Sequence, residues 1–137
     1  MGQKHSKIQS LVEPFLGQAL DARYLGYFDC FNRGLFFEAH EVLEDLWLLD
    51  RKGAEGNFYK GLIQLAGAFV HLQKGRPSPA TSLFRLTLGN LKRYPAIHRQ
   101  LDLSALTRRI ENWILELEQG KSLLIDQRPH LKLETKK

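Results

Sequence analysis

Hydrophobic residues recur along most of this chain at spacings of three and four, which is the period of an amphipathic α-helix. A short helix is also expected near residues 8–12, ending near Pro14. Gly34 and Gly120 stand where a left-handed residue often ends a helix. The longer predicted helices cover about residues 20–32, 35–49, 57–74, 78–93 and 104–119. The spacing therefore predicts an all-α fold, a compact bundle of about five to six helices.

The segment 57–74 differs from the others, because apolar residues cover most of its circumference. One side carries Phe58, Leu62, Leu65, Phe69 and Leu72, and another carries Ile63, Ala66 and Val70. A helix with this pattern usually occupies the middle of a bundle. Gly61 and Gly67 leave bare backbone, which lets a neighbouring helix approach closely. We expect this segment to be the central buried helix, surrounded by the others.

The two ends of the chain are expected to be peripheral. Pro129, Leu131 and Leu133 alternate with polar residues, which predicts an extended segment docked on the bundle. Residues 1–18 and 134–137 are expected to be peripheral or frayed. No repeat or low-complexity linker divides the 137 residues, a length typical of one domain. We therefore expect a single helical domain over residues 1–137.

Composition narrows the class of protein. Hydrophobic residues make up 43% of the chain, which is too many for a disordered one. No apolar run approaches the roughly 20 residues of a membrane span, and residues 1–10 lack a signal-peptide core. The single cysteine, Cys30, excludes a disulfide framework and a Cys-rich zinc site, and is expected to be a small core residue. A cytoplasmic protein without a membrane partner is expected.

The formal net charge of +5 is unevenly spread. Residues 1–50 hold four basic and eight acidic side chains, whereas residues 74–101 hold six basic side chains and no acidic one. Two interpretations stay open: a basic face for an anionic partner, or an acidic helix packed near a basic one. A strong nucleic-acid binder shows a larger excess and a recognisable module, so that partner is disfavoured. The oligomeric state stays open. The candidate basic face consists of Arg76, Arg85, Lys92 and Arg93.

The densest group of chemically active residues is His40-Glu41-Val42-Leu43-Glu44. It begins like the zinc-protease motif H-E-x-x-H, but Glu44 stands where the second histidine is required. On a helix His40 and Glu44 lie about 40° apart, on the shoulder of the apolar stripe. Glu41 lies on the opposite side, which is expected to face solvent. His98, near a loop, is also expected to be solvated.

The segment 57–74 offers partners for this pair, since Lys60, Gln64 and His71 fall within about 60° around that helix. If they face His40 and Glu44, the polar side chains converge. One interpretation is a structural hydrogen-bond network. The other is a ligand site, or a divalent metal site held by His40, Glu44 and His71, with Glu41 or Glu44 as the base that activates a bound water.

The blocks that carry these residues resemble a known family. Phe31-Asn32-x-Gly34 followed by residues 36–47, then residues 59–66 and His71-Leu72-x-x-Gly75, are similar to the domain of unknown function 309 family of bacteria and archaea. The resemblance implies an all-helical fold with one central helix, and no established activity. Family members usually follow the last glycine with Asn, where this chain has Arg76. The family's signature positions correspond to Glu38, His40, Glu41, Glu44, Trp47, Gly61, Gln64 and His71.

The sequence assigns no reaction, and two classes of function remain. The first is a small-ligand or metal-binding protein, with or without catalysis, that uses the candidate polar site. The second is a non-enzymatic interaction module that uses the acidic helix 35–49 or the basic face within residues 74–99. The candidate polar site consists of His40, Glu41, Glu44, Gln64 and His71.

Overall fold

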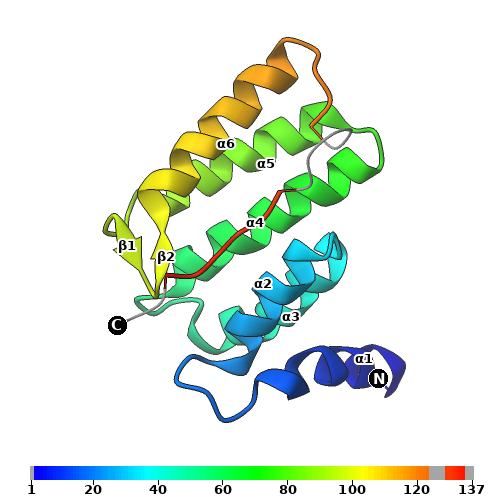
Figure 1. Cartoon of the computed structure of the whole chain (residues 1–137), viewed down its shortest axis with the longest axis vertical. Coiled ribbons are helices and arrows are strands. Elements are labelled where there is room, and N and C mark those ends of the chain that lie inside the picture. The colour runs from blue at the N-terminus through cyan, green and yellow to red at the C-terminus, as the bar shows by residue number, and fades with distance from the viewer. Residues whose placement is uncertain (1, 124–128, 135–137) are drawn as a thin grey trace.

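The computed structural model describes residues 2–123 and 129–134, with side chains from Lys7 onward. Six α-helices of these residues pack into a bundle, which confirms the all-α prediction (Figure 1). Every predicted boundary from residue 20 to residue 119 lies within two residues of the observed one. The helices are α1 (Gly2–Val12), α2 (Ala22–Asn32), α3 (Phe36–Asp50), α4 (Gly56–Gln73), α5 (Pro77–Leu91) and α6 (Leu103–Glu118), and a 3-10 turn, η1 (Glu13–Phe15), follows α1. None of the helices described is long and apolar enough to cross a membrane.

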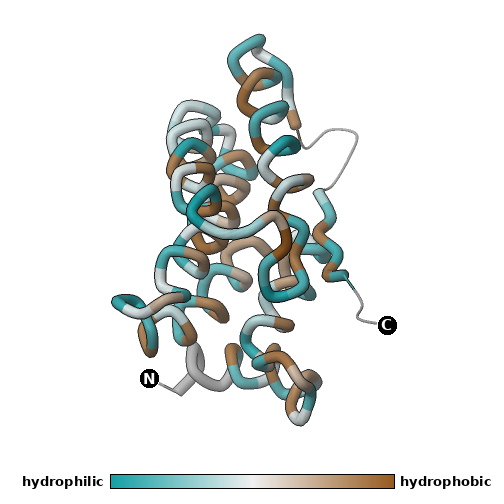
Figure 2. Tube along the Cα trace, turned by 90° about the vertical axis from the view of Figure 1, so that its left-hand side faces the viewer, coloured by the Kyte–Doolittle hydropathy of each residue, from teal (hydrophilic) through white to brown (hydrophobic). Residues whose placement is uncertain are grey.

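α4 is the central helix, as predicted. Figure 1 shows α5 and α6 on one side of it, α2 and α3 on the other, and α1 beyond them. Leu62 and Leu65 are fully buried, and the hydroxyl of Tyr27 on α2 donates a hydrogen bond to the Leu62 carbonyl (2.6 Å). Figure 2 shows hydrophobic and hydrophilic positions interspersed along the helical part of the chain.

α4 and α5 approach each other closely at two glycines. A Cβ atom added at Gly61 would lie 3.2 Å from Cβ of Asn90 and 3.1 Å from Cδ2 of Leu91. At Gly67 it would lie 3.3 Å from Cδ1 of Leu83. These contacts confirm that the bare backbone of α4 accommodates a neighbouring helix, and they set where α5 lies beside the candidate site.

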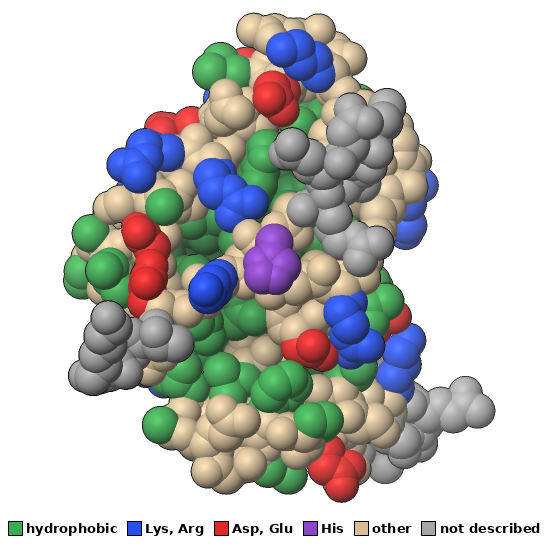
Figure 3. Space-filling view, viewed as in Figure 1, with side chains coloured by type: hydrophobic (Ala, Val, Ile, Leu, Met, Phe, Trp, Pro, Cys, Tyr) green, Lys and Arg blue, Asp and Glu red, His purple; other side chains and the backbone are tan. Residues whose placement is uncertain are grey.

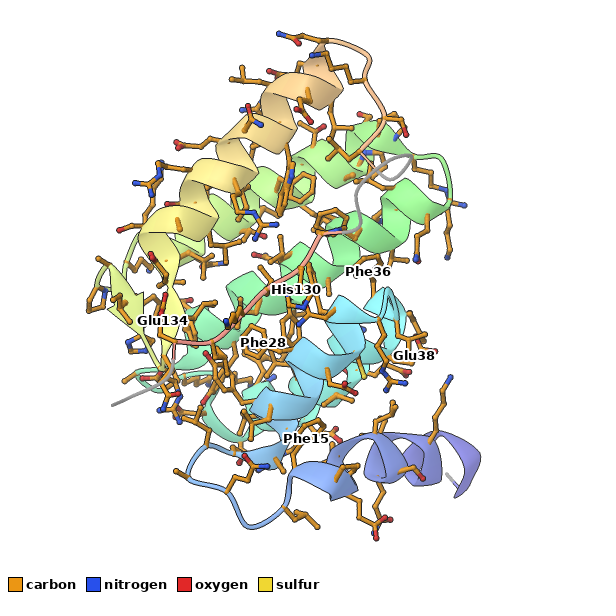
Figure 4. All side chains as sticks on the ribbon, viewed as in Figure 1. Phe15, Phe28, Phe36, Glu38, His130 and Glu134 are labelled. Carbon is orange, nitrogen blue, oxygen red and sulfur yellow. The ribbon has the colours of Figure 1, made fainter. Side chains whose placement is uncertain are left out.

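The extended C-terminal segment is docked on the bundle, as predicted. Residues 129–134 cross in front of α4, and Figure 4 labels His130 and Glu134 along them. The Asn32 side-chain amide donates to the Leu131 carbonyl and accepts from the Leu131 N–H, both at 2.7 Å. Glu134 was expected to fray, but its N–H donates to the Gln100 carbonyl. Residues 135–137 lie outside the described residues.

A short hairpin between α5 and α6 was not predicted. Strands β1 (Ile97–His98) and β2 (Leu101–Asp102) pair antiparallel, with His98 opposite Leu101. Arg99 and Gln100 between them both have positive φ, 46° and 65°, the geometry of a type I′ turn. Tyr24 and Glu134 hold the turn from outside, donating to the carbonyls of Arg99 and Gln100.

The prediction that Glu41 faces solvent is wrong, because this residue is only 7% exposed. The reason is α1, which is longer than predicted and packs on this side of α3. There Lys7 on α1 forms an ion pair with Glu38 on α3 (2.9 Å). Glu41 therefore belongs to the α1–α3 interface.

Candidate functional site

The register between α3 and α4 sets the candidate site. The Lys60 ammonium lies 5.7 Å from the centre of the Trp47 ring, and the Phe36 and Phe69 rings stack with centroids 5.0 Å apart. These contacts fix two antiparallel helices, so His40, which lies between Phe36 and Trp47, is placed beside the middle of α4. We call His40 and Glu44 of α3, together with Lys60, Gln64 and His71 of α4, the α3–α4 strip.

His40 and Glu44 form the predicted pair on the outer side of α3. Nε2 of His40 lies 3.6 Å from Oε2 of Glu44, and the two side chains are 31% and 39% exposed. This separation is longer than a hydrogen bond. The pair is therefore half-exposed and loosely joined, and a ligand can reach both groups from solvent.

The inner nitrogen of each strip histidine has no partner. Nδ1 of His40 and Nδ1 of His71 are buried and form no hydrogen bond within the described part of the chain. A neutral imidazole carries its proton on one nitrogen, and orphaned buried N–H groups are rarer than orphaned acceptors. In the tautomer that carries its proton on Nε2, neither ring leaves a buried N–H without a partner among the described residues.

The orientation of Gln64 is set by a residue of α5. Nδ2 of Asn90 donates a hydrogen bond to Oε1 of Gln64 (2.8 Å). This bond uses one lone pair of the Gln64 oxygen and leaves the Gln64 NH₂ group as a donor. Sequence reasoning did not assign Asn90 to the site, because helical periodicity says nothing about which residue of a neighbouring helix lies opposite.

The geometry does not fit the metal set of His40, Glu44 and His71. A histidine that binds a metal through one nitrogen almost always donates its other N–H to a partner, but here Nδ1 has none among the described residues. The same residues contain no group of three or more His, Cys, Asp or Glu side chains that could hold a metal ion. The metal set stays a prediction from sequence, and the strip favours a different chemistry.

Two of the four residues of the candidate basic face form ion pairs with α6. Arg85 pairs with Glu118, and Nζ of Lys92 lies 3.5 Å from Glu111. The ion pairs of the basic residues at α5 are therefore formed with α6. The acidic helix α3 forms its ion pair with Lys7 of α1 instead. Arg76 and Arg93, the other two members, are exposed.

His98 is not solvated as expected. Its Nε2 lies 2.7 Å from Oε1 of Glu55, and both side chains are about four-fifths buried. The ring packs edge-on against Phe58 (4.7 Å between centroids) and beside Tyr94 (4.8 Å). Sequence reasoning missed this second His–Glu pair, because the unpredicted hairpin brings together residues that lie far apart in the chain.

Comparison with known proteins supports the family resemblance. Residues 24–83 match the family model described as a domain of unknown function (DUF309). An uncharacterized protein of Aquifex aeolicus (strain VF5) is 27% identical over 110 residues, which cover 80% of this chain and 33% of that protein. The chain thus spans about a third of the length of this curated relative. The matched range contains the whole α3–α4 strip and ends before Asn90.

Proposed function

We propose that the α3–α4 strip, which lies within the range that matches the domain of unknown function 309 model, binds a small ligand rich in hydrogen-bond acceptors, a carboxylate or a phosphate. The observation that carries this proposal is the pair of buried, unpartnered Nδ1 atoms of His40 and His71. They favour the tautomer with the proton on Nε2, and Nε2 then acts as a donor.

Two further donors support the same ligand chemistry. The Gln64 NH₂ group is left unused by the bond from Asn90, and Lys60 adds an exposed ammonium above the Trp47 ring. Hydrogen bonds from a cation to an anionic acceptor are about twice as strong as neutral ones. The strip therefore combines one positive charge with neutral donors around it.

Glu44 narrows the choice of ligand. Its carboxylate lies beside His40 and repels an anionic group placed directly against it. It can accept a hydrogen bond from a hydroxyl group of the ligand instead. A ligand with a hydroxyl near its anionic group, such as a hydroxy acid or a phosphorylated alcohol, matches both the donors of the strip and the Glu44 acceptor.

Titration of the ¹⁵N-labelled chain with citrate or inorganic phosphate, followed by NMR, tests the proposal. We expect saturable shifts at the backbone amides of His40, Gln64 and His71. Gln64→Glu replaces the donor by a carboxylate of similar shape and should weaken binding about tenfold or more, equivalent to about 1.4 kcal/mol. Gln119→Glu, an exposed position at the end of α6, is the matched control and should leave affinity unchanged.

Two results would contradict the proposal. One is the absence of saturable shifts with either anion, and the other is equal weakening by Gln64→Glu and Gln119→Glu. Added Zn²⁺ provides a further comparison. A saturable response to Zn²⁺ that disappears in both His40→Ala and His71→Ala, with no response to the anions, would favour the metal set.

A further inference from the structure

A cavity lies away from the α3–α4 strip, where α1 and η1 meet α2 and α3. Its volume is about 330 Å³. Two of its lining residues, Glu13 and Leu16, flank Phe15 along the chain, and Figure 4 labels Phe15. Figure 3 shows hydrophobic side chains gathered over this lower part of the molecule. No residue of the strip lines the cavity, so any ligand it holds is independent of the proposed function.

One wall of this cavity is apolar. Ile8 and Val12 of α1 are half-buried, and Leu16 after η1 is 65% exposed, a large hydrophobic side chain left in solvent. Ligand pockets range from about 300 to 1,000 Å³, so this volume suits a small molecule with one aromatic ring or a short alkyl chain. Covering Leu16 would remove apolar surface from water and favour such an occupant.

The polar part of the cavity carries an excess of negative charge. Among the side chains described, Arg23 is the one basic residue of the lining, and it forms two hydrogen bonds with the Asp21 carboxylate (3.1 and 3.0 Å). Glu13 and Asp45 line the same cavity, and neither carboxylate forms a hydrogen bond or ion pair with the side chains described. The charge of Asp45 also acts on Arg23, so the lining holds two carboxylates against one guanidinium that is already bonded to Asp21. This excess beside an apolar wall attracts a cation that has an apolar body.

We propose that this cavity binds a small organic amine in its ammonium form. The ammonium group lies between the carboxylates of Glu13 and Asp45, where it donates charge-assisted hydrogen bonds. The apolar body packs against Ile8, Val12 and Leu16. Because these residues come from α1, η1 and α3, a bound amine joins α1 to the rest of the bundle and raises its stability.

Three probes of similar size and different charge test this site: phenethylamine, 2-phenylethanol and 3-phenylpropionate. The full chain is titrated with each, and binding is followed by NMR shifts at the amides of residues 8–16 and 45 and by the melting temperature. We expect saturable shifts and a rise in melting temperature with the amine, weaker shifts with the alcohol, and none with the acid.

Asp45→Asn should weaken binding of phenethylamine about tenfold, because it removes one carboxylate without changing the size of the side chain. Asp29→Asn on α2 is the matched control and should leave the affinity unchanged, since Asp29 pairs with Arg33 outside the cavity. The proposal is overturned if none of the three probes gives saturable shifts, if the acid binds as well as the amine, or if the two variants weaken binding equally.

Discussion

The link between Asn32 and Leu131 provides the sharpest test of how the C-terminal segment is held. Asn32 ends α2, and its side-chain amide forms two hydrogen bonds of 2.7 Å with the backbone of Leu131. Leu131 itself is 3% exposed. Asn32→Ala removes both bonds and leaves the surrounding apolar contacts of the segment in place.

The expected loss follows from these two bonds. A hydrogen bond between neutral groups contributes about 0.5–1.5 kcal/mol net, so the pair contributes about 1–3 kcal/mol. Detachment of the segment would also expose Leu131, whose burial is worth about 1.5–3 kcal/mol. The chain entropy that the released residues regain opposes this second loss. We therefore expect Asn32→Ala to lower the free energy of unfolding by about 1–3 kcal/mol.

Urea unfolding of Asn32→Ala, Asn32→Asp and a control, Asn112→Ala, measures this loss, and amide hydrogen exchange at Leu131 locates it. Asn112 is exposed on α6, so its replacement should change stability by less than about 0.5 kcal/mol. Asn32→Asp keeps the acceptor but turns a carboxylate oxygen toward the Leu131 carbonyl, and should destabilise at least as much as Asn32→Ala. Wild-type stability and wild-type protection of the Leu131 amide in Asn32→Ala would refute the reasoning.

Three further predictions concern packing, charge and the thiol. Gly61→Ala should cost about 1–3 kcal/mol in urea unfolding because its Cβ meets α5, whereas Gly89→Ala, which meets nothing, should stabilise by about 0.5–1 kcal/mol; the reverse order would contradict the close approach of the helices. Hydrogen bonds from Arg23 hold the pKa of Asp21 below its ordinary value of 3.8. Wild type should therefore melt above Asp21→Asn at neutral pH and lose this advantage as the pH falls below that value; curves that stay parallel down to strong acid would contradict it. Burial raises the pKa of the Cys30 thiol to about 11, so iodoacetamide near about pH 8 should modify Cys30 quickly in urea and slowly in the native chain; fast native modification would show that the core opens there.

The helices could be predicted because their signals are local. The apolar stripe of each helix and the glycines that follow two of them depend on neighbours within one or two turns. The all-round apolar pattern of α4 also predicts its central position, since no other place in a bundle covers every side of a helix. The extent of α1 could not be predicted in this way. Its helix begins at Gly2, well before the apolar residues that indicated it.

The hairpin at residues 97–102 could not be predicted, because the contacts that set it are not local. Type I′ turns favour Asn-Gly or Gly-Gly, and Arg99-Gln100 carries no such signal. Positive φ at two non-glycine residues is sustained by distant groups: the Tyr24 hydroxyl and the backbone of Glu134. The turn is therefore set by tertiary contacts, and the burial of His98 depends on it.

In the candidate site, too, the local features could be predicted and the tertiary contacts could not. Helical periodicity places Lys60, Gln64 and His71 on one strip of α4, and His40 and Glu44 one turn apart on α3. Periodicity does not tell which atom each side chain presents. For Gln64 the bond from Asn90 engages the oxygen, and for the two histidines Nδ1 has no partner among the described residues. The His/Glu/Gln set suggests metal ligands by residue type. With the ring protons on Nε2, as proposed above, the same residues supply donors for the proposed anion site.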